Sequence, residues 1–114
     1  AVAAIGLVLQ VVTVIANLCR NAGEAGASRV RCTLRESDNR IIGFVDDDGP
    51  GLDAEASGRI FTPGFSSKAD PTGLGRGIGL ELVRRTVTSR GGTIEVGPSR
   101  LGGTRFSFEI ERPA

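Results

Sequence analysis

The residues best suited to chemistry begin with a glycine-rich run that leads into a helical pattern. Glycine recurs at every second position from Gly73 to Gly79. Without Cβ atoms the backbone N–H groups can crowd around an anion, and the first turn of a helix adds unpaired N–H donors. The run predicts a phosphate site, although a loop before a surface helix fits the same pattern. No Gly-Lys-Ser/Thr follows, and the spacing is not Gly-x-Gly-x-x-Gly, so neither a P-loop nor a dinucleotide fingerprint is present.

Two asparagines on one helix face form a second candidate for a functional site. Asn17, Asn21 and Glu24 stand at positions i, i+4 and i+7 of a predicted helix, where side chains share one face. Asparagine is a poor helix former because its side chain competes for backbone hydrogen bonds. Two on one face therefore suggest a use other than helix formation, and a merely solvated face is the alternative.

Three consecutive carboxylates, Asp46 to Asp48, follow a predicted strand and precede Gly49 and Gly51. Such a cluster suits a divalent cation, a solvated acidic turn, or one carboxylate turned inward to accept a hydrogen bond. Because strand side chains alternate in direction, Asp47 should point away from the side taken by its two neighbours.

Composition excludes several classes of function. The 114 residues suit one domain, and 14 basic against 13 acidic residues leave no charge excess for nucleic acid. There is no histidine, so zinc chemistry is disfavoured. Cys19 and Cys32 have no metal-ligand spacing, and we expect both to be buried filler residues of a protein in a reducing cytoplasm. The chain begins without methionine, and we expect it to be part of a longer protein.

The apolar N-terminal segment is predicted to be a core helix and not a membrane span. No basic segment precedes it, and Gln10, Thr13 and Asn17 interrupt it. At about 100° per residue, one arc of about 120° collects the residues expected to pack: Val8, Val11, Val12, Ile15, Leu18, Cys19 and Ala22.

Alternation and turn residues predict two antiparallel hairpins, 29–45 and 93–110. A second main helix is predicted at 77–89, with an apolar stripe of Ile78, Leu82, Val83 and Val87, and Gly91-Gly92 should end it. A short helix is expected at 53–60 and a long lid-like loop at 61–72. These elements predict an α+β sandwich with an antiparallel or mixed sheet and helices on one face.

Taken in order, these motifs resemble the N, G1, F and G2 boxes of the GHKL nucleotide-binding superfamily. They are Asn17 with Asn21, Asp47-x-Gly49-Pro-Gly51, Phe61-x-x-x-Phe65, and Gly75-x-Gly77-x-Gly79. The chain looks like the catalytic ATP-binding domain of a bacterial sensor histidine kinase, most similar to the citrate and C4-dicarboxylate sensors. The resemblance implies a Bergerat-type two-layer α/β sandwich across residues 1–114.

The resemblance also implies roles for individual residues. Asn21 would hold Mg²⁺ against the triphosphate of ATP, with Asn17 also facing the phosphates. Asp47 would accept a hydrogen bond from the adenine amino group, supported by Thr104. The residues implied to lie around the base and phosphates are Gly49, Gly51, Lys68, Gly75, Arg76, Gly77, Gly79 and Leu80. For Lys68, an exposed charge on a loop remains an alternative.

Without histidine, the chain has no residue of its own to receive phosphate in the manner of a histidine kinase. The resemblance therefore implies a partner, the His-containing dimerisation domain of the same parent protein, and a downstream response regulator. It implies a cytoplasmic location for this part of the parent. ATP-hydrolysing GHKL proteins carry glutamate where Asn17 stands, which argues against that alternative. A degenerate nucleotide-binding scaffold is a further alternative.

Overall fold

A computed structural model of the chain describes residues 2–52 and 76–112, with side chains at 5–52 and 79–112. Its elements are α1 (Val2–Glu24), β1 (Val30–Ser37), β2 (Arg40–Asp47), α3 (Arg76–Ser89), β3 (Thr93–Pro98) and β4 (Thr104–Glu111). The helix expected at 53–60 and the lid expected at 61–72 lie outside the described residues. Every element predicted within the described ranges forms close to its expected bounds.

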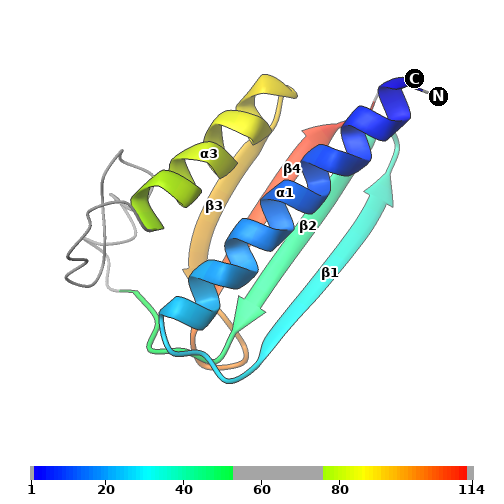
Figure 1. The fold of residues 1–114 in the computed structure, drawn as a ribbon. Helices are drawn as coiled ribbons and strands as arrows, with labels where there is room; N and C mark the ends of the chain where they lie inside the picture. The colour runs from blue at the N-terminus through cyan, green and yellow to red at the C-terminus, as the bar shows by residue number, and fades with distance from the viewer. Residues whose placement is uncertain (1, 53–75, 113–114) are drawn as a thin grey trace.

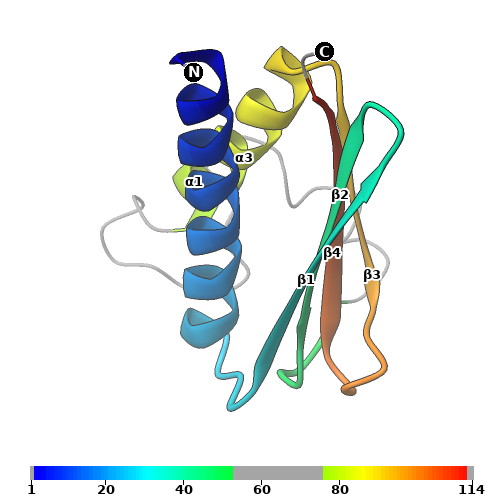
Figure 2. The same ribbon diagram turned by 90° about the vertical axis from the view of Figure 1, so that its right-hand side faces the viewer.

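The four described strands form one antiparallel sheet in the order β1-β2-β4-β3. Each predicted hairpin forms, and the pairing of β2 with β4 joins them, with Val45 opposite Phe106. Both helices lie on one face of this sheet, side by side (Figures 1 and 2). The α+β two-layer fold predicted from the sequence is confirmed.

Local residue chemistry explains the turns. Asp38, in the turn between β1 and β2, has a φ of 53°, a left-handed conformation that aspartate tolerates better than most residues. The α3 helix stops where Gly91 adopts a φ of 67°. There the N–H groups of Gly91 and Gly92 donate to the carbonyls of Thr88 and Val87 at 3.1 and 3.0 Å. These bonds satisfy carbonyls that the end of a helix leaves open.

The core lies between the helices and the sheet. Its largest fully buried side chains are Phe106, Phe108, Leu18, Val14, Val45, Val83 and Val87. Gly43 makes room for one of them, because a Cβ there would lie 2.2 Å from the ring of Phe108, its cross-strand partner. The ring of Phe108 therefore packs directly on the backbone of Gly43 and fills the space that a side chain there would occupy.

The packing face of α1 differs from the predicted one. Val8 and Val12 were expected to pack but are 59% and 57% exposed. The buried stripe is Leu7, Val11, Val14, Leu18 and Ala22. The difference arises because α1 packs against α3 as well as against the sheet, so its buried side is turned away from β1. Toward the start of the helix, α1 and β1 also diverge (Figure 2).

In α3, Leu82 was also expected to pack but is 40% exposed, and Leu80 is buried in its place.

Among the described helices, α1 alone has the length and apolarity of a membrane span, a test that the core helix of a soluble protein also passes. One stripe of α1 packs in the core, and 28% of its apolar window is buried in the fold.

The opposite face of the sheet carries an ion pair in which the Asp46 carboxylate is buried and the Arg105 side chain is 40% exposed. Arg105 Nε and Nη2 donate to the two oxygens of Asp46 at 2.8 and 3.1 Å, and Ser99 Oγ donates to Oδ1 at 2.8 Å. The guanidinium also lies 4.6 Å from the centre of the Phe44 ring. The hydrogen bond from Arg105 is the largest cause of a lowered pKa at Asp46, and it outweighs the burial of the carboxylate.

Replacing Asp46 with Asn should destabilise the fold by about 1–3 kcal/mol at pH 7, because Arg105 loses a charged acceptor at a buried site. The lowered pKa means that the stabilisation is complete above the unfolded pKa of about 4 and is lost as pH falls through the folded pKa. Urea denaturation from pH 7 to pH 3 should therefore show a shallower acid decline for Asp46→Asn.

Glu109→Gln is the matched control. Glu109 pairs with Arg40 at 2.7 Å on the same face, but its side chain is 40% exposed. Its loss should cost under about 1 kcal/mol. Equal effects of the two variants would contradict the account of Asp46.

Candidate functional site

The carboxylate of Asp47 is held at the end of β2, and the residue is only 4% exposed. Its Oδ1 accepts hydrogen bonds from the backbone N–H of Gly49 at 2.9 Å and of Thr104 at 3.1 Å. No hydrogen bond to Oδ2 is found in the described part of the chain. One oxygen is thus anchored by the backbone at the junction of β2 and β4.

Glycines allow the backbone to approach this carboxylate. Gly103 donates its N–H to the Asp47 carbonyl at 3.1 Å. A Cβ on Gly103 would lie 2.3 Å from Asp47 Oδ1, and one on Gly49 would lie 3.1 Å from it. Gly51 has a φ of 78° and lies beside the carbonyl of Gly103. Sequence reasoning did not single out Gly103; its signal was the Gly-Gly pair at the start of a strand.

The three consecutive carboxylates have three different environments. Asp46 binds Arg105 on the outer face, whereas Asp47 binds the backbone at the start of β4, as strand alternation predicts. Asp48 Oδ1 accepts the N–H groups of Ser28 and Arg29 at 2.7 and 2.9 Å, with the bond from Arg29 the main cause of its lowered pKa. Among the described residues, no group of three or more acidic, cysteine or histidine side chains could hold a metal.

Asn17 lies where α1 meets the start of α3. Its Nδ2 donates to the Thr13 carbonyl at 2.8 Å, and its Oδ1 accepts from Arg20 Nη2. A Cβ on Gly79 would lie 3.2 Å from that same oxygen. Gly79 therefore allows the two helices to approach at Asn17, while the next residue, Leu80, is buried in the core. Sequence reasoning did not identify Arg20.

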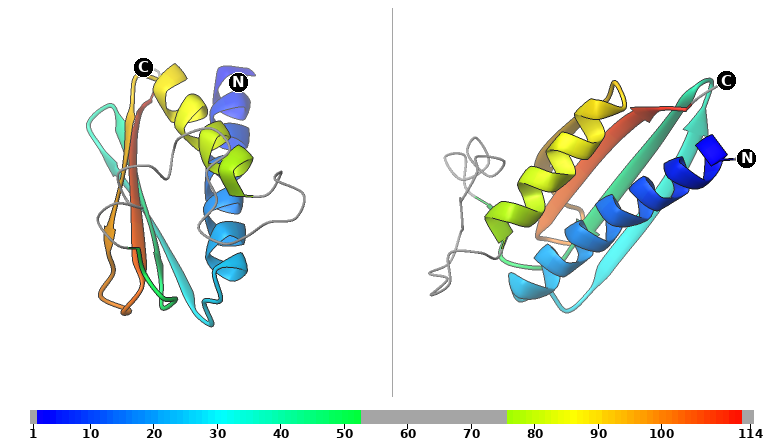
Figure 3. Two further views of the ribbon diagram at one scale, coloured as in Figure 1. Left: turned by 90° about the vertical axis from the view of Figure 1, so that its left-hand side faces the viewer. Right: turned by 45° about the horizontal axis from the view of Figure 1, so that its top comes forward.

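Asn21 is partly buried one turn later, and its side chain makes no hydrogen bond within the described ranges. The segment after α1 lies beside the Asp47 turn, because a Cβ on Gly49 would be 3.6 Å from the Cβ of Ala27. The C-terminal end of α1, the end of β2 and the start of β4 lie at the same end of the molecule (Figure 3).

Four further residues predicted from the sequence lie at or before the start of α3 in the chain. Arg76 and Gly77 belong to the first turn of this helix. Lys68 and Gly75 lie outside the described residues.

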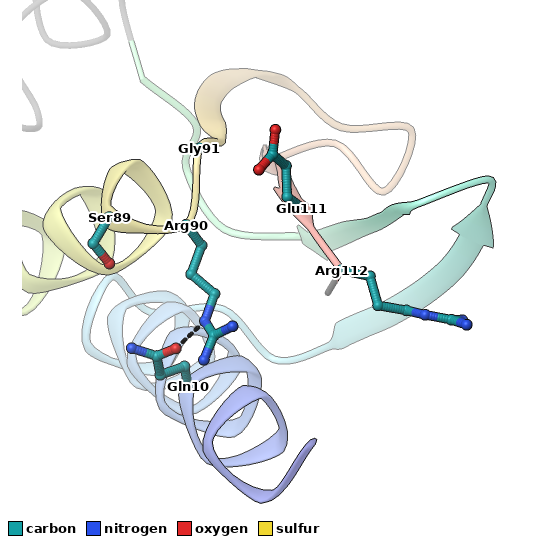
Figure 4. Close-up of a pocket in the computed structure, with 6 residues that line it drawn as sticks. All are labelled: Gln10, Ser89, Arg90, Gly91, Glu111 and Arg112. Atoms are coloured by element: carbon teal, nitrogen blue, oxygen red, sulfur yellow. Dashed lines mark hydrogen bonds between the residues drawn. The ribbon is translucent and has the colours of Figure 1, made fainter. Parts of the chain in front are cut away.

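A separate open cavity of about 360 Å³ lies at the other end of the fold (Figure 4). It is lined by Gln10, Ser89, Arg90, Gly91, Glu111 and Arg112. Arg90 Nε donates to Gln10 Oε1 and ties α1 to the end of α3. The second arginine of the lining, Arg112, pairs with Glu36. Both arginines thus already have partners, and the cavity contains none of the residues selected from the sequence.

The described helices on one face of an antiparallel sheet, with a backbone-anchored carboxylate at the sheet end, form an α+β two-layer domain. Residues 6–114 match the family described as histidine kinase-, DNA gyrase B- and HSP90-like ATPases. The chain belongs to this family.

Sensor proteins are among the relatives of the chain. It is 36% identical over 98 residues to the sensor histidine kinase GtrS of Pseudomonas aeruginosa, covering 86% of this chain and 20% of that protein. It is 38% identical over 117 residues to the C4-dicarboxylate transport sensor protein DctB of Rhizobium meliloti, covering 96% of this chain and 17% of that protein. The chain thus spans about a fifth of the length of these relatives.

Among solved structures, the catalytic domain of histidine kinase ThkA superposes with a TM-score of 0.76 at 28% identity. The match covers 91% of this chain and 67% of that one. This agreement supports the resemblance drawn from the sequence motifs, including a C4-dicarboxylate sensor among the relatives.

Gly103→Ala should destabilise the fold by about 1–3 kcal/mol, because its Cβ would overlap the Asp47 carboxylate and force the turn apart. Gly97→Ala is the control: it is also in the second hairpin, and a Cβ there meets nothing within 4 Å. Urea denaturation should show a clear loss for Gly103→Ala and a change within about 0.5 kcal/mol for Gly97→Ala. Equal stability of the two variants would refute the tight approach at Gly103.

Proposed function

We propose that this domain binds Mg²⁺ and ATP and donates the γ-phosphate to a histidine on a separate dimerisation segment of the same parent protein. The observation that carries the proposal is the buried Asp47 carboxylate, with one oxygen fixed by two backbone N–H groups. The sensor histidine kinases among its relatives give the reaction class. The parent would act in the cytoplasm on a downstream response regulator.

The Asp47 arrangement favours adenine over guanine. An anchored carboxylate is a hydrogen-bond acceptor, and adenine presents an amino group on the edge where guanine presents a carbonyl oxygen. With guanine, the carbonyl oxygen of the base would face the carboxylate oxygen of Asp47. Two hydrogen-bond acceptors would then meet without a proton in a buried site, which is unfavourable. Because Gly49 and Gly51 have no side chains, a flat base could lie close to the backbone beside Asp47.

The phosphates would lie between Asn21 and the start of α3. The side-chain amide oxygen of the partly buried Asn21 has no protein partner in the described ranges. An amide oxygen suits Mg²⁺, which accepts few protein ligands beside phosphate and water. Asn17, on α1, lies next to Gly79. Gly79 is near the start of α3, where the backbone N–H groups of a helix favour anions. Arg76 and Lys68 would add positive charge from the start of α3 and the segment before it.

When bound, Mg²⁺ would neutralise phosphate charge, which is the main requirement of phosphoryl transfer together with positioning. The protein residues would hold the nucleotide and would not hydrolyse it. Asn17 cannot accept a proton from water, and the chain contains no histidine to accept phosphate. We therefore propose a phosphate donor that depends on an acceptor outside this chain.

Asp47→Ala should weaken ATP binding about 10- to 150-fold, because it removes a charge-assisted hydrogen bond of about 1.5–3 kcal/mol. Calorimetric titration with ATP and GTP measures this effect. Asp46→Asn is the control, since the neighbouring carboxylate faces the other side of the sheet and should leave the affinity within about twofold at a temperature where both variants are folded. Unchanged ATP affinity in Asp47→Ala, or equal binding of GTP by the parent chain, would contradict the adenine role.

Asn21→Ala should remove phosphate transfer to the His-bearing segment supplied in trans, because Mg²⁺ loses its protein ligand, while part of the adenine affinity remains. Transfer of labelled γ-phosphate is the readout. Asn39→Ala, in the turn between β1 and β2, is the matched asparagine control and should transfer normally. The proposal fails if Asn21→Ala transfers as fast as the parent chain, or if the isolated chain hydrolyses ATP briskly.

A further inference from the structure

The two cysteines of the chain meet across the gap between α1 and β1. Cys19 lies near the C-terminal end of the helix and Cys32 lies in the edge strand, and their sulfur atoms are 3.4 Å apart. Both are free thiols. A disulfide needs a sulfur separation of about 2.05 Å, so the two sulfur atoms have to move closer before the bond can form.

Cys32 is not the buried filler residue that the sequence suggested. Its sulfur lies beside that of Cys19 on α1, but Cys32 is exposed, whereas Cys19 is partly buried. On the same strand face, Val30 and Leu34 are 40% and 51% exposed. An oxidant can therefore reach the Cys32 sulfur, and Cys19 lies directly beside it.

We propose that Cys19 and Cys32 form a reversible disulfide that clamps α1 to the edge strand when the protein meets a peroxide. The Cys32 thiolate attacks one peroxide oxygen, the O–O bond breaks, and Cys32 becomes a sulfenic acid as water leaves. The Cys19 sulfur then attacks the Cys32 sulfur. The S–S bond forms, the S–O bond breaks, and a second water carries away the oxygen with the Cys19 proton. Two thiols and one hydrogen peroxide thus give one disulfide and two waters.

The local electrostatics support this order of events. Burial first, then the hydrogen bond and charge of Cys32, raise the pKa of the Cys19 thiol to about 11. The burial of Cys19, which is the largest cause, keeps its thiol protonated and less reactive than an exposed thiol toward an oxidant in solution. Exposure therefore assigns the first step to Cys32, and the 3.4 Å separation of the sulfur atoms places Cys19 where it can resolve the sulfenic acid.

The clamp would act on the stability of the fold and not by blocking the Asn17 side of α1. Two residues along a helix correspond to about 200°, so Cys19 lies on the far side of α1 from Asn17 and Asn21. The bond would close a loop across a separation of 13 residues. Restricting that loop in the unfolded chain should raise the melting temperature by roughly 5–15 °C.

The test treats the 114-residue chain with one equivalent of hydrogen peroxide and measures its intact mass. A loss of about 2 Da, protection of both thiols from alkylation, and reversal by dithiothreitol are expected. Cys32→Ser changes an exposed residue and should fold, and Cys19→Ser removes the resolving thiol. Both variants should fail to lose 2 Da, and Cys19→Ser should gain oxygen at Cys32.

The melting temperature of the oxidised chain is then compared with that of the reduced chain. Three results would each overturn the proposal: addition of oxygen to the parent chain in place of the 2 Da loss, a disulfide dimer in place of the intramolecular bond, or a disulfide that leaves the melting temperature unchanged or lower. Nucleotide binding is not part of the readout, so this test stands apart from that of the proposed function.

Discussion

The hydrogen bonds from two backbone N–H groups to one oxygen of Asp47 are the constraint on which the candidate site depends. They join the end of β2 to the start of β4, two strands that are adjacent in the sheet but 57 residues apart in the sequence at the Asp47–Thr104 contact. Gly49 and Gly103 make this possible, because any side chain at Gly103 would occupy the position of the carboxylate oxygen. The carboxylate is therefore buried with hydrogen bonds to one oxygen, and no residue of the described ranges donates to the other.

The rest of the fold supports this end of the sheet. Val45, two residues before Asp47, packs in the core with Phe106, two residues after Thr104, so the strands are held in register close to the site. On the outer face, the Asp46–Arg105 pair joins the same two strands. The α1 helix contributes Leu18 to the core and carries Asn17 and Asn21 on its polar side. The packing that stabilises the domain thus also fixes the spacing between Asp47 and the asparagines.

Periodicity in the sequence was enough to predict both hairpins, both described helices and the direction of Asp47, because these depend on local alternation and on turn residues. It was wrong for Val8, Val12 and Leu82, because the buried arc of a helix depends on which neighbours it contacts. It was also wrong for Cys32, because the extent to which α1 covers the edge strand is a tertiary property. The role of Gly103 was missed because it depends on a contact with Asp47, a residue far away in the sequence. The role of Arg20 was missed because its hydrogen bond to Asn17 depends on the side-chain rotamer. Whether Lys68 and Gly75 join the site remains a prediction.

The most direct test of the central claim is a titration of the ¹⁵N-labelled chain with Mg²⁺ and ADP, followed by amide NMR. The account predicts that the largest shifts include the N–H groups of Gly49 and Thr104, which bind Asp47 Oδ1 and would respond when the other oxygen accepts the adenine amino group. The amides around the cavity at the opposite end, Gly91 and Glu111, should stay nearly unchanged. Large shifts at Gly91 and Glu111 with none at Gly49 and Thr104 would contradict the assignment of Asp47 as the adenine-binding residue.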